Sequence, residues 1–275
     1  MTVWEVSSPS AWPNAPRWMS FSALTELESC PRRWALSSAD YKYLWDKNGY
    51  PHTIQPSMLE GKVVHLALEK ITNALAKCRC PSLIDERAYL TLKNLGGYTA
   101  IIVDCLNNVL WPYETNPRAV PILEGVRRRL EARVPELRAL VQRLLSRIHL
   151  ESSPRNQFDI NTHGIGKSRC QLQHGSHAEV NLCVTELGWH GIADLLTLSS
   201  GLCEIRDFKT GTYKKQHESQ LHTYALLWAR DQTLNPTGRL ADRLVLSYND
   251  RDVDVSVPEL KELLSLENEI GRAHV

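Results

Sequence analysis

The sequence predicts an α/β fold: a helix, a three-stranded antiparallel or mixed sheet, a second helix and a further strand, with a helical insertion. Two apolar runs, residues 190–198 and 202–211, are joined by Ser-Ser-Gly, and turn residues between β-type runs indicate a hairpin. A third run, residues 179–184, alternates polar and apolar side chains as a half-buried strand does. Helical periodicity flanks these strands on both sides. Residues 20–268 are therefore expected to form a single domain.

The N-terminal part is expected to contribute an arm and short helices before this core begins. Residues 1–19 contain three tryptophans and three prolines and predict a poorly ordered arm. Ser22 is a suitable N-cap for a helix that stops before Pro31. The aromatic run from Trp34 to Trp45 indicates another helix, which the Asn-Gly-Tyr-Pro run at 48–51 ends.

The first helix of the core is expected at residues 59–77. Its apolar stripe has helical spacing and consists of Val64, Leu68, Ile71 and Leu75. His65 flanks this stripe, Gly61 lies one turn before it, and Glu69 one turn after it. A glycine at that place lets another backbone or a substrate approach the imidazole closely.

Residues 82–150 have helical patterns and form the predicted insertion. In its C-terminal half, Pro135 should start a new helix or kink the existing one. That half carries seven arginines, including Arg127 and Arg128, against three glutamates. Two interpretations stay open: a surface that tracks the phosphates of DNA, or the solvated face of an amphipathic helix.

The remaining elements follow in order along the chain. Residues 152–177 are polar and predict a mobile loop. Residues 220–228 have a helical pattern, with Gln220 and Tyr224 on one face. Residues 244–248 are expected to be a strand that returns beside the hairpin through this helical crossover, followed by an alternating edge strand at 253–257.

The hairpin brings charged side chains together. Asp194 lies in its first strand, and Asp207 and Lys209 point the same way from its second, because side chains alternate along a strand. Two carboxylates and an ammonium are expensive to bury unless a cation or a substrate balances the charge. Hard divalent cations such as Mg²⁺ take oxygen ligands and activate water beside a phosphate. Alone, the triplet is weak evidence, since an ordinary surface Asp–Lys pair has the same residues.

Five motifs together resemble those of the PD-(D/E)XK nuclease superfamily. They are His65 within G-x-x-x-H, Gly191-Ile192-Ala193-Asp194, Asp207-Phe208-Lys209-Thr210-Gly211, Gln220-x-x-x-Tyr224 and Cys30-Pro31-Arg32-Arg33-Trp34. Their order and spacing are similar to the RecB-like branch, which includes helicase–nuclease subunits and CRISPR-associated RecB-like exonucleases. The resemblance covers about residues 20–260 and implies a restriction-endonuclease-like core with a helical insertion.

The resemblance also implies roles for individual residues. His65, Asp194, Asp207 and the backbone carbonyl of Phe208 would hold Mg²⁺ or Mn²⁺. Lys209 would be the catalytic lysine, acting with Asp194 and Asp207. Gln220 and Tyr224 would support the site and the DNA. Apart from the resemblance, Glu179 is expected as a further supporting residue, and Arg127 and Arg128 are candidate DNA contacts because of their charge.

Composition narrows the classes of function. Lys and Arg number 32 against 31 Asp and Glu, so a field that attracts phosphates must be local. No apolar run approaches the ~20 residues of a membrane helix, and the first residues lack the pattern of a signal peptide. The seven cysteines are expected to be mostly reduced. These features predict a cytoplasmic protein without a membrane partner.

Cys30 raises the question of an iron–sulfur cluster. In iron–sulfur members of the RecB-like branch, one cysteine precedes the first motif and three follow the last strand, whereas no cysteine follows Cys203 here. Residues 269–275 can be written in codons that match a common sequencing adaptor, so we expect a non-native tail. A [4Fe–4S] cluster would then form only if the native C-terminus supplied three more cysteines. Otherwise Cys30 is a buried apolar side chain beside Trp34.

The predicted function is metal-dependent hydrolysis of DNA phosphodiester bonds. We expect an exonuclease or end-processing enzyme of repair, recombination or phage defence, acting on single-stranded DNA or ends, with a helicase or a repair or defence complex as partner. Two alternatives stay open: a non-catalytic DNA-binding or scaffolding module of the same fold, and a nuclease acting on RNA. Intact His65, Asp194, Asp207 and Lys209 argue against the first, because a degenerate site would have lost at least one of them.

Overall fold

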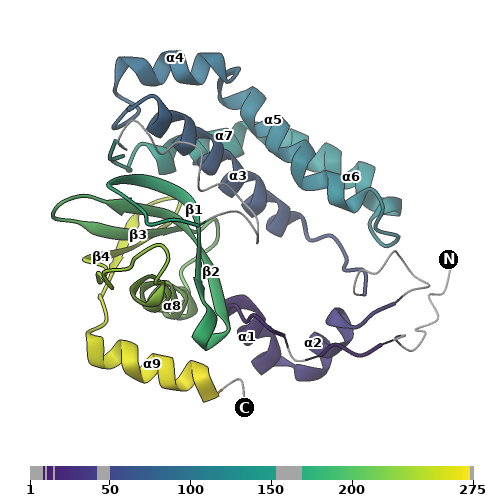
Figure 1. Ribbon diagram of the computed structural model, residues 1–275. Helices are drawn as coiled ribbons and strands as arrows, with labels where there is room; N and C mark the ends of the chain where they lie inside the picture. The colour runs from purple at the N-terminus through teal and green to yellow at the C-terminus, as the bar shows by residue number, and fades with distance from the viewer. Residues whose placement is uncertain (1–8, 10, 15, 42–49, 153–168, 273–275) are drawn as a thin grey trace.

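A mixed five-stranded sheet lies between two layers of helices (Figure 1). The computed structural model describes residues 9, 11–14, 16–41, 50–152 and 169–272. The strand order is β1-β2-β3-β4-β5; β1, β2 and β3 are antiparallel neighbours, β4 is parallel to β3, and β5 is antiparallel to β4. The α/β class and the order of helix, three strands, helix and strand are confirmed.

The strands match the predicted hairpin and its neighbours. Their bounds are β1 Gly175–Val184, β2 Trp189–Leu198, β3 Cys203–Phe208, β4 Arg243–Ser247 and β5 Asp252–Val255. The hairpin closes where Leu198 pairs with Cys203. The prediction of a loop through residue 177 is wrong at its end, because β1 already begins at Gly175. There the hydroxyls of Ser176 and Thr197 bond at 3.0 Å, so polar side chains pair across a buried part of the sheet.

One face of the sheet is covered by a layer of helices that includes the predicted insertion. This layer consists of α3 Pro56–Lys77, α4 Glu86–Asn94, α5 Gly97–Leu110, the short η1 Trp111–Tyr113, α6 Val120–Ala132 and α7 Val134–Leu145, of which all but α3 lie in the insertion. As predicted, Pro135 lies in the first turn of a new helix, where its missing N–H has no intrahelical partner to lose. The predicted stripe of α3 is buried throughout: Val64, Leu68, Ile71 and Leu75.

The opposite face is covered by α8 Lys215–Arg230, which connects β3 to β4 and is followed outward by α9 Leu260–Arg272 (Figure 1). Helix α9 was not predicted. Its Leu263 is buried and its Glu267 accepts from Arg230 of α8 at 2.5 Å, so contacts with α8 hold it. Part of the segment expected to be a non-native tail lies in this helix; residues 273–275 are outside the described residues. Within the described chain, no helix is long and apolar enough to cross a membrane.

The N-terminal helices begin and end differently from the prediction. Helix α1 Phe21–Ser29 is capped by Ser20, whose hydroxyl accepts from the Ala23 amide, rather than by Ser22. Helix α2 Pro31–Ser38 ends before Tyr41, and the rest of the predicted aromatic helix, residues 42–49, is outside the described residues.

Met19, the last residue of the expected arm, is buried and adds to the sheet. Its N–H donates to the Gly188 carbonyl at 2.7 Å, and its carbonyl accepts from the His190 N–H at 2.9 Å. The start of β2 extends beyond its pairing with β3, which leaves those backbone groups available.

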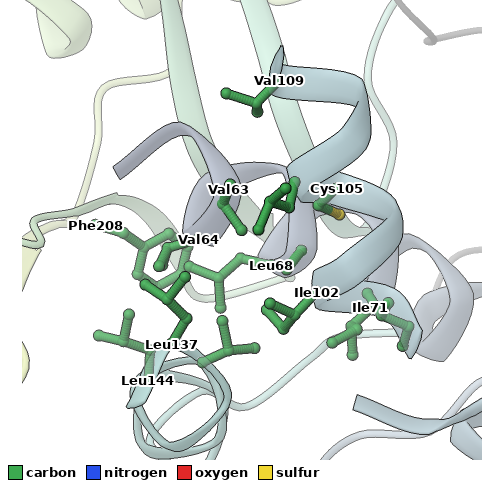
Figure 2. Packing of buried hydrophobic residues seen from close by; sticks show 14 of the residues in the cluster. Val63, Val64, Leu68, Ile71, Ile102, Cys105, Val109, Leu137, Leu144 and Phe208 are labelled. Atoms are coloured by element: carbon green, nitrogen blue, oxygen red, sulfur yellow. The ribbon is translucent and has the colours of Figure 1, made fainter. Parts of the chain in front are cut away.

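Packing between α3 and β3 determines where the charged residues meet. Figure 2 shows Phe208 of β3 beside Val64 of α3, with Leu137 and Leu144 of α7 below them. Val64 precedes His65, and Phe208 follows Asp207. The apolar contact therefore brings the histidine-bearing helix to the charged end of β3.

Truncating this core should be costly. We expect Leu68→Ala to lower the free energy of unfolding by about 2–5 kcal/mol, because Leu68 is buried in the α3 layer. The exposed Leu90 of α4 provides the matched control, and Leu90→Ala should change it by less than about 0.5 kcal/mol. Urea unfolding of both variants checks this; equal losses would contradict the packing described.

Candidate metal centre

Three potential ligands from three elements converge at one place. His65 comes from α3, Glu179 from β1 and Asp194 from β2, and one ligand atom from each lies within 4.8 Å of the other two. His65 Nδ1 is 3.1 Å from Asp194 Oδ1. The other oxygen, Asp194 Oδ2, accepts from the backbone amide of Phe208 at 2.6 Å, which ties β2 to β3 at the site.

Glu179 was expected only to support the site, but the structure places its carboxylate among the candidate ligands. Its φ is +51°, a left-handed conformation that non-glycine residues seldom adopt. Pairing of β1 with β2 holds at Ala178–Leu195 and resumes at Val180–Ala193, and Glu179 and Asp194 face each other between them. The strained residue thus coincides with the two opposed carboxylates, and such strain is often found at functional sites.

Asp207 lies beside this group and is ion-paired with Lys209, whose Nζ is 2.5 Å from Asp207 Oδ2. Lys209 Nζ also donates to Gln220 Oε1 at 2.8 Å, and Gln220 Nε2 donates to the Tyr224 hydroxyl at 2.7 Å. The predicted common face of Gln220 and Tyr224 is confirmed. The ion pair with Asp207 and the hydrogen bond to Gln220 together position the Lys209 ammonium.

When all three are ionised, the carboxylates of Glu179, Asp194 and Asp207 carry more negative charge than Lys209 and protonated His65 balance. Burial raises the pKa of Glu179 to about 8, with a further contribution from Asp194. Burial and the charge of Asp194 also raise the pKa of Asp207 above its usual range. Burial by itself would lower the pKa of His65, but the charge and hydrogen bond of Asp194 raise it to about 9. Carboxylate oxygens, an imidazole and excess negative charge fit a divalent cation such as Mg²⁺ or Mn²⁺.

Two glycines of the predicted motifs allow close approaches. A Cβ at Gly191 would lie 2.8 Å from the Tyr224 ring, so the ring can pack against β2 only because residue 191 has no side chain. A Cβ at Gly61 would lie 3.3 Å from Thr210 Oγ1. The close approach expected near His65 is therefore made by the segment that follows β3.

The other predicted site residues lie elsewhere or contribute backbone. The structure shows the amide of Phe208 bound to Asp194, which holds the backbone of the expected carbonyl ligand in the site. Arg127 and Arg128 lie on α6 and interact with their own helical layer: Arg127 donates to Asn107 at 2.8 Å, and Arg128 lies 3.5 Å from Glu124.

Cys30 caps α2 rather than packing as a buried apolar side chain. Its Sγ accepts from the Arg33 amide at 3.4 Å, and the residue is half-buried. Among the residues that the structure describes, the cluster of potential metal ligands contains no cysteine.

Little in the sequence marked Glu179 as a ligand. It is one of three polar residues, with His177 and Asn181, that alternate with apolar ones in β1, and alternation predicts a face but not a partner. Only the register between β1 and β2, which places residue 179 opposite Asp194, distinguishes it from Asn181.

A comparison with protein families shows which known proteins this chain is similar to. The sequence model of the PD-(D/E)XK nuclease superfamily matches residues 18–270, which include the described cluster and the chain from Asp207 to Tyr224. A search of curated proteins finds no significant match.

The raised pKa values of Glu179 and His65 predict that the metal-free protein becomes less stable as the pH rises. Glu179 ionises near pH 4.5 in the unfolded chain but only near pH 8 in the folded protein, so the folded state loses stability between these pH values. The stabilisation from protonated His65 is lost between pH 6.5, the pKa of the unfolded chain, and about 9, the pKa of the folded protein. We expect the Tm in EDTA to fall over this range. Excess Mn²⁺ or Mg²⁺ should reduce the fall, because a cation binds the deprotonated ligands. Thermal melts across pH, with and without metal, measure both effects.

Glu179→Gln is the informative variant for this prediction. It cannot ionise, so its Tm in EDTA should depend less on pH, and metal should raise its Tm less than in the wild type. A metal effect of the same size at every pH would contradict the assignment of these groups.

Gly191→Ala should damage the site through packing. The added Cβ must displace the Tyr224 ring, and overpacking of this kind costs about 1–3 kcal/mol of the free energy of unfolding. Gly201→Ala is the matched control, because a Cβ there meets nothing within 4 Å. Denaturant unfolding of both variants tests the point; equal stabilities would show that the ring moves freely.

Proposed function

Because this chain belongs to the PD-(D/E)XK nuclease superfamily, we propose that it is a metal-dependent nuclease that hydrolyses phosphodiester bonds of DNA at the cluster described. The observation that supports this most strongly is the position of Lys209. It is held between Asp207 and Gln220, beside the group formed by His65, Glu179 and Asp194.

We assign the metal ligands to His65, Asp194, Asp207 and the carbonyl of Phe208, and add Glu179 as a fifth. A bound Mg²⁺ or Mn²⁺ would lower the pKa of its water and neutralise charge on the scissile phosphate.

Lys209 has the position of a donor in this reaction. Lys209 donates to Gln220 and is ion-paired with Asp207, and its ammonium keeps a donor that is available to orient the attacking water or to stabilise negative charge on the phosphate. Gln220 and Tyr224 position the lysine. The Tyr224 ring is buried against Gly191, so the support is rigid.

The finer assignment rests on the order of the motifs. We propose the RecB-like branch, and with it exonuclease or end-processing activity in repair, recombination or phage defence, in the cytoplasm. A helicase or a repair or defence complex is the proposed partner. Arg127 and Arg128 remain candidates for DNA contact, since exposed ion pairs are weak and a phosphate can compete for them.

Loss of the lysine or of its carboxylate partner should abolish activity. We expect Lys209→Ala and Asp207→Ala to reduce Mg²⁺- or Mn²⁺-dependent cleavage by at least about 10²-fold while the far-UV circular dichroism stays unchanged. Lys93→Ala, at an exposed position of α4, is the matched control and should cleave as the wild type does. Single-stranded DNA, double-stranded DNA and RNA should each be assayed with metal and with EDTA.

Each rival function predicts a different pattern in this assay. A scaffolding module binds DNA but cleaves none of the three substrates with any metal, and an RNA nuclease cleaves only RNA. Full activity in Lys209→Ala would refute the catalytic assignment.

A further inference from the structure

A cavity of about 350 Å³ opens beside the candidate metal centre. His65 and Lys209 line it, together with the segment between β3 and α8 and the first turn of α8. This segment and this turn contribute Thr212, Lys214 and His217, none of which has a role in the function proposed above. The cavity is within the size range of sites for small ligands and is lined by donors.

Lys214 supplies a positive charge that no described carboxylate neutralises. Its side chain is exposed and forms no ion pair with the described residues, whereas Arg127 and Arg128 each have an acidic neighbour. The acidic residue of the first turn of α8, Glu218, accepts from the Tyr213 hydroxyl. Lys214 is therefore available to an anion.

His217 contributes an oriented imidazole to the same cavity. Its Nδ1 is 2.7 Å from the Tyr248 hydroxyl, which orients the ring, and its Nε2 forms no hydrogen bond with a described residue. Burial, with the charges of Lys209 and Lys214, lowers the pKa of His217 to about 4. The ring is therefore neutral at pH 7. When the Tyr248 hydroxyl donates to Nδ1, the imidazole proton lies on Nε2.

The start of α8 adds to this positive field. The helix has 16 residues, and the side chain of its N-cap residue, Lys214, makes no capping hydrogen bond. Free N–H groups and the helix dipole favour an anion at that end. The cavity, the lysine, the oriented imidazole and the helix start together match one ligand group, a phosphate.

We propose that Lys214 and His217 bind the phosphate next to the scissile phosphate, on the same nucleic-acid strand. The inference rests on the proposed function for the identity of the strand, because His65 and Lys209 line the same cavity. The site then holds two consecutive phosphates: one at the candidate metal centre and one against α8. The neighbouring phosphate positions the strand and does not take part in bond cleavage.

Equilibrium binding tests this without requiring cleavage. Affinity of the full-length protein for a short, labelled single strand is measured by fluorescence anisotropy in EDTA over a range of salt concentrations. A set of strands carries one neutral methylphosphonate, moved along the linkages one at a time. For the wild type, we expect one of these replacements to weaken binding about tenfold, the loss of one hydrogen bond to a charged group.

Lys214→Ala and His217→Ala should each weaken binding of the unmodified strand by about the same factor and respond less than the wild type to that methylphosphonate. Lys214→Ala should also reduce the slope of log K against log salt by about 0.7, the value for one phosphate contact on a single strand. Lys214→Arg should restore most of the affinity and most of the salt slope. Lys215→Ala is the matched control, since Lys215 is an exposed neighbour that does not line the cavity, and it should bind as the wild type does.

Equal affinities and salt slopes for Lys214→Ala and Lys215→Ala, or a full methylphosphonate response in Lys214→Ala and His217→Ala, would overturn the phosphate site. Kinetics in Mg²⁺ separate this from the proposed function. If the phosphate site is correct, Lys214→Ala raises KM about tenfold with little change in kcat. Absence of cleavage by the wild type, with the binding pattern intact, would refute only the nuclease proposal.

Discussion

The carboxylate of Asp194 connects the elements on which this site depends. One oxygen faces His65 of α3, and the other accepts from the Phe208 amide of β3, so a helix and two strands meet at one side chain. Such a connection carries an electrostatic cost, because Glu179 and Asp207 bring further negative charge into a partly desolvated space. A bound divalent cation would offset this cost, so this structural junction is also the candidate metal centre.

The two apolar cores, one on each face of the sheet, position different residues of the site. The core of the α3 layer includes Phe208 and Val64 and sets the distance from His65 to β3 (Figure 2). The core on the α8 side holds Tyr224 beside β2, and through Gln220 it fixes Lys209. Since each core supplies a different part of the site, a packing change on either side of the sheet reaches the same charged residues.

Most elements were predictable because their signals are local. The apolar stripe of α3, the turn after Leu198 and the helix start at Pro135 depend on spacing and on backbone preferences that neighbouring residues determine. Two of the errors arose where distant contacts stabilise a segment. The start of β1 pairs with β2 despite its polar residues, and α9 is held by an ion pair and a buried leucine against another helix.

The sequence by itself determined which chemistry was available: an Asp, an Asp-x-Lys and a Gln-x-x-x-Tyr in an order and spacing that indicate a metal-dependent nuclease. Tertiary structure decided which carboxylates share the centre, because Glu179 joins Asp194 through strand register and a strained backbone. It also decided which basic side chains form ion pairs with nearby carboxylates, as Lys209 does with Asp207. Charge is a property of the residue, whereas burial, pairing and distance arise only when separate elements pack together.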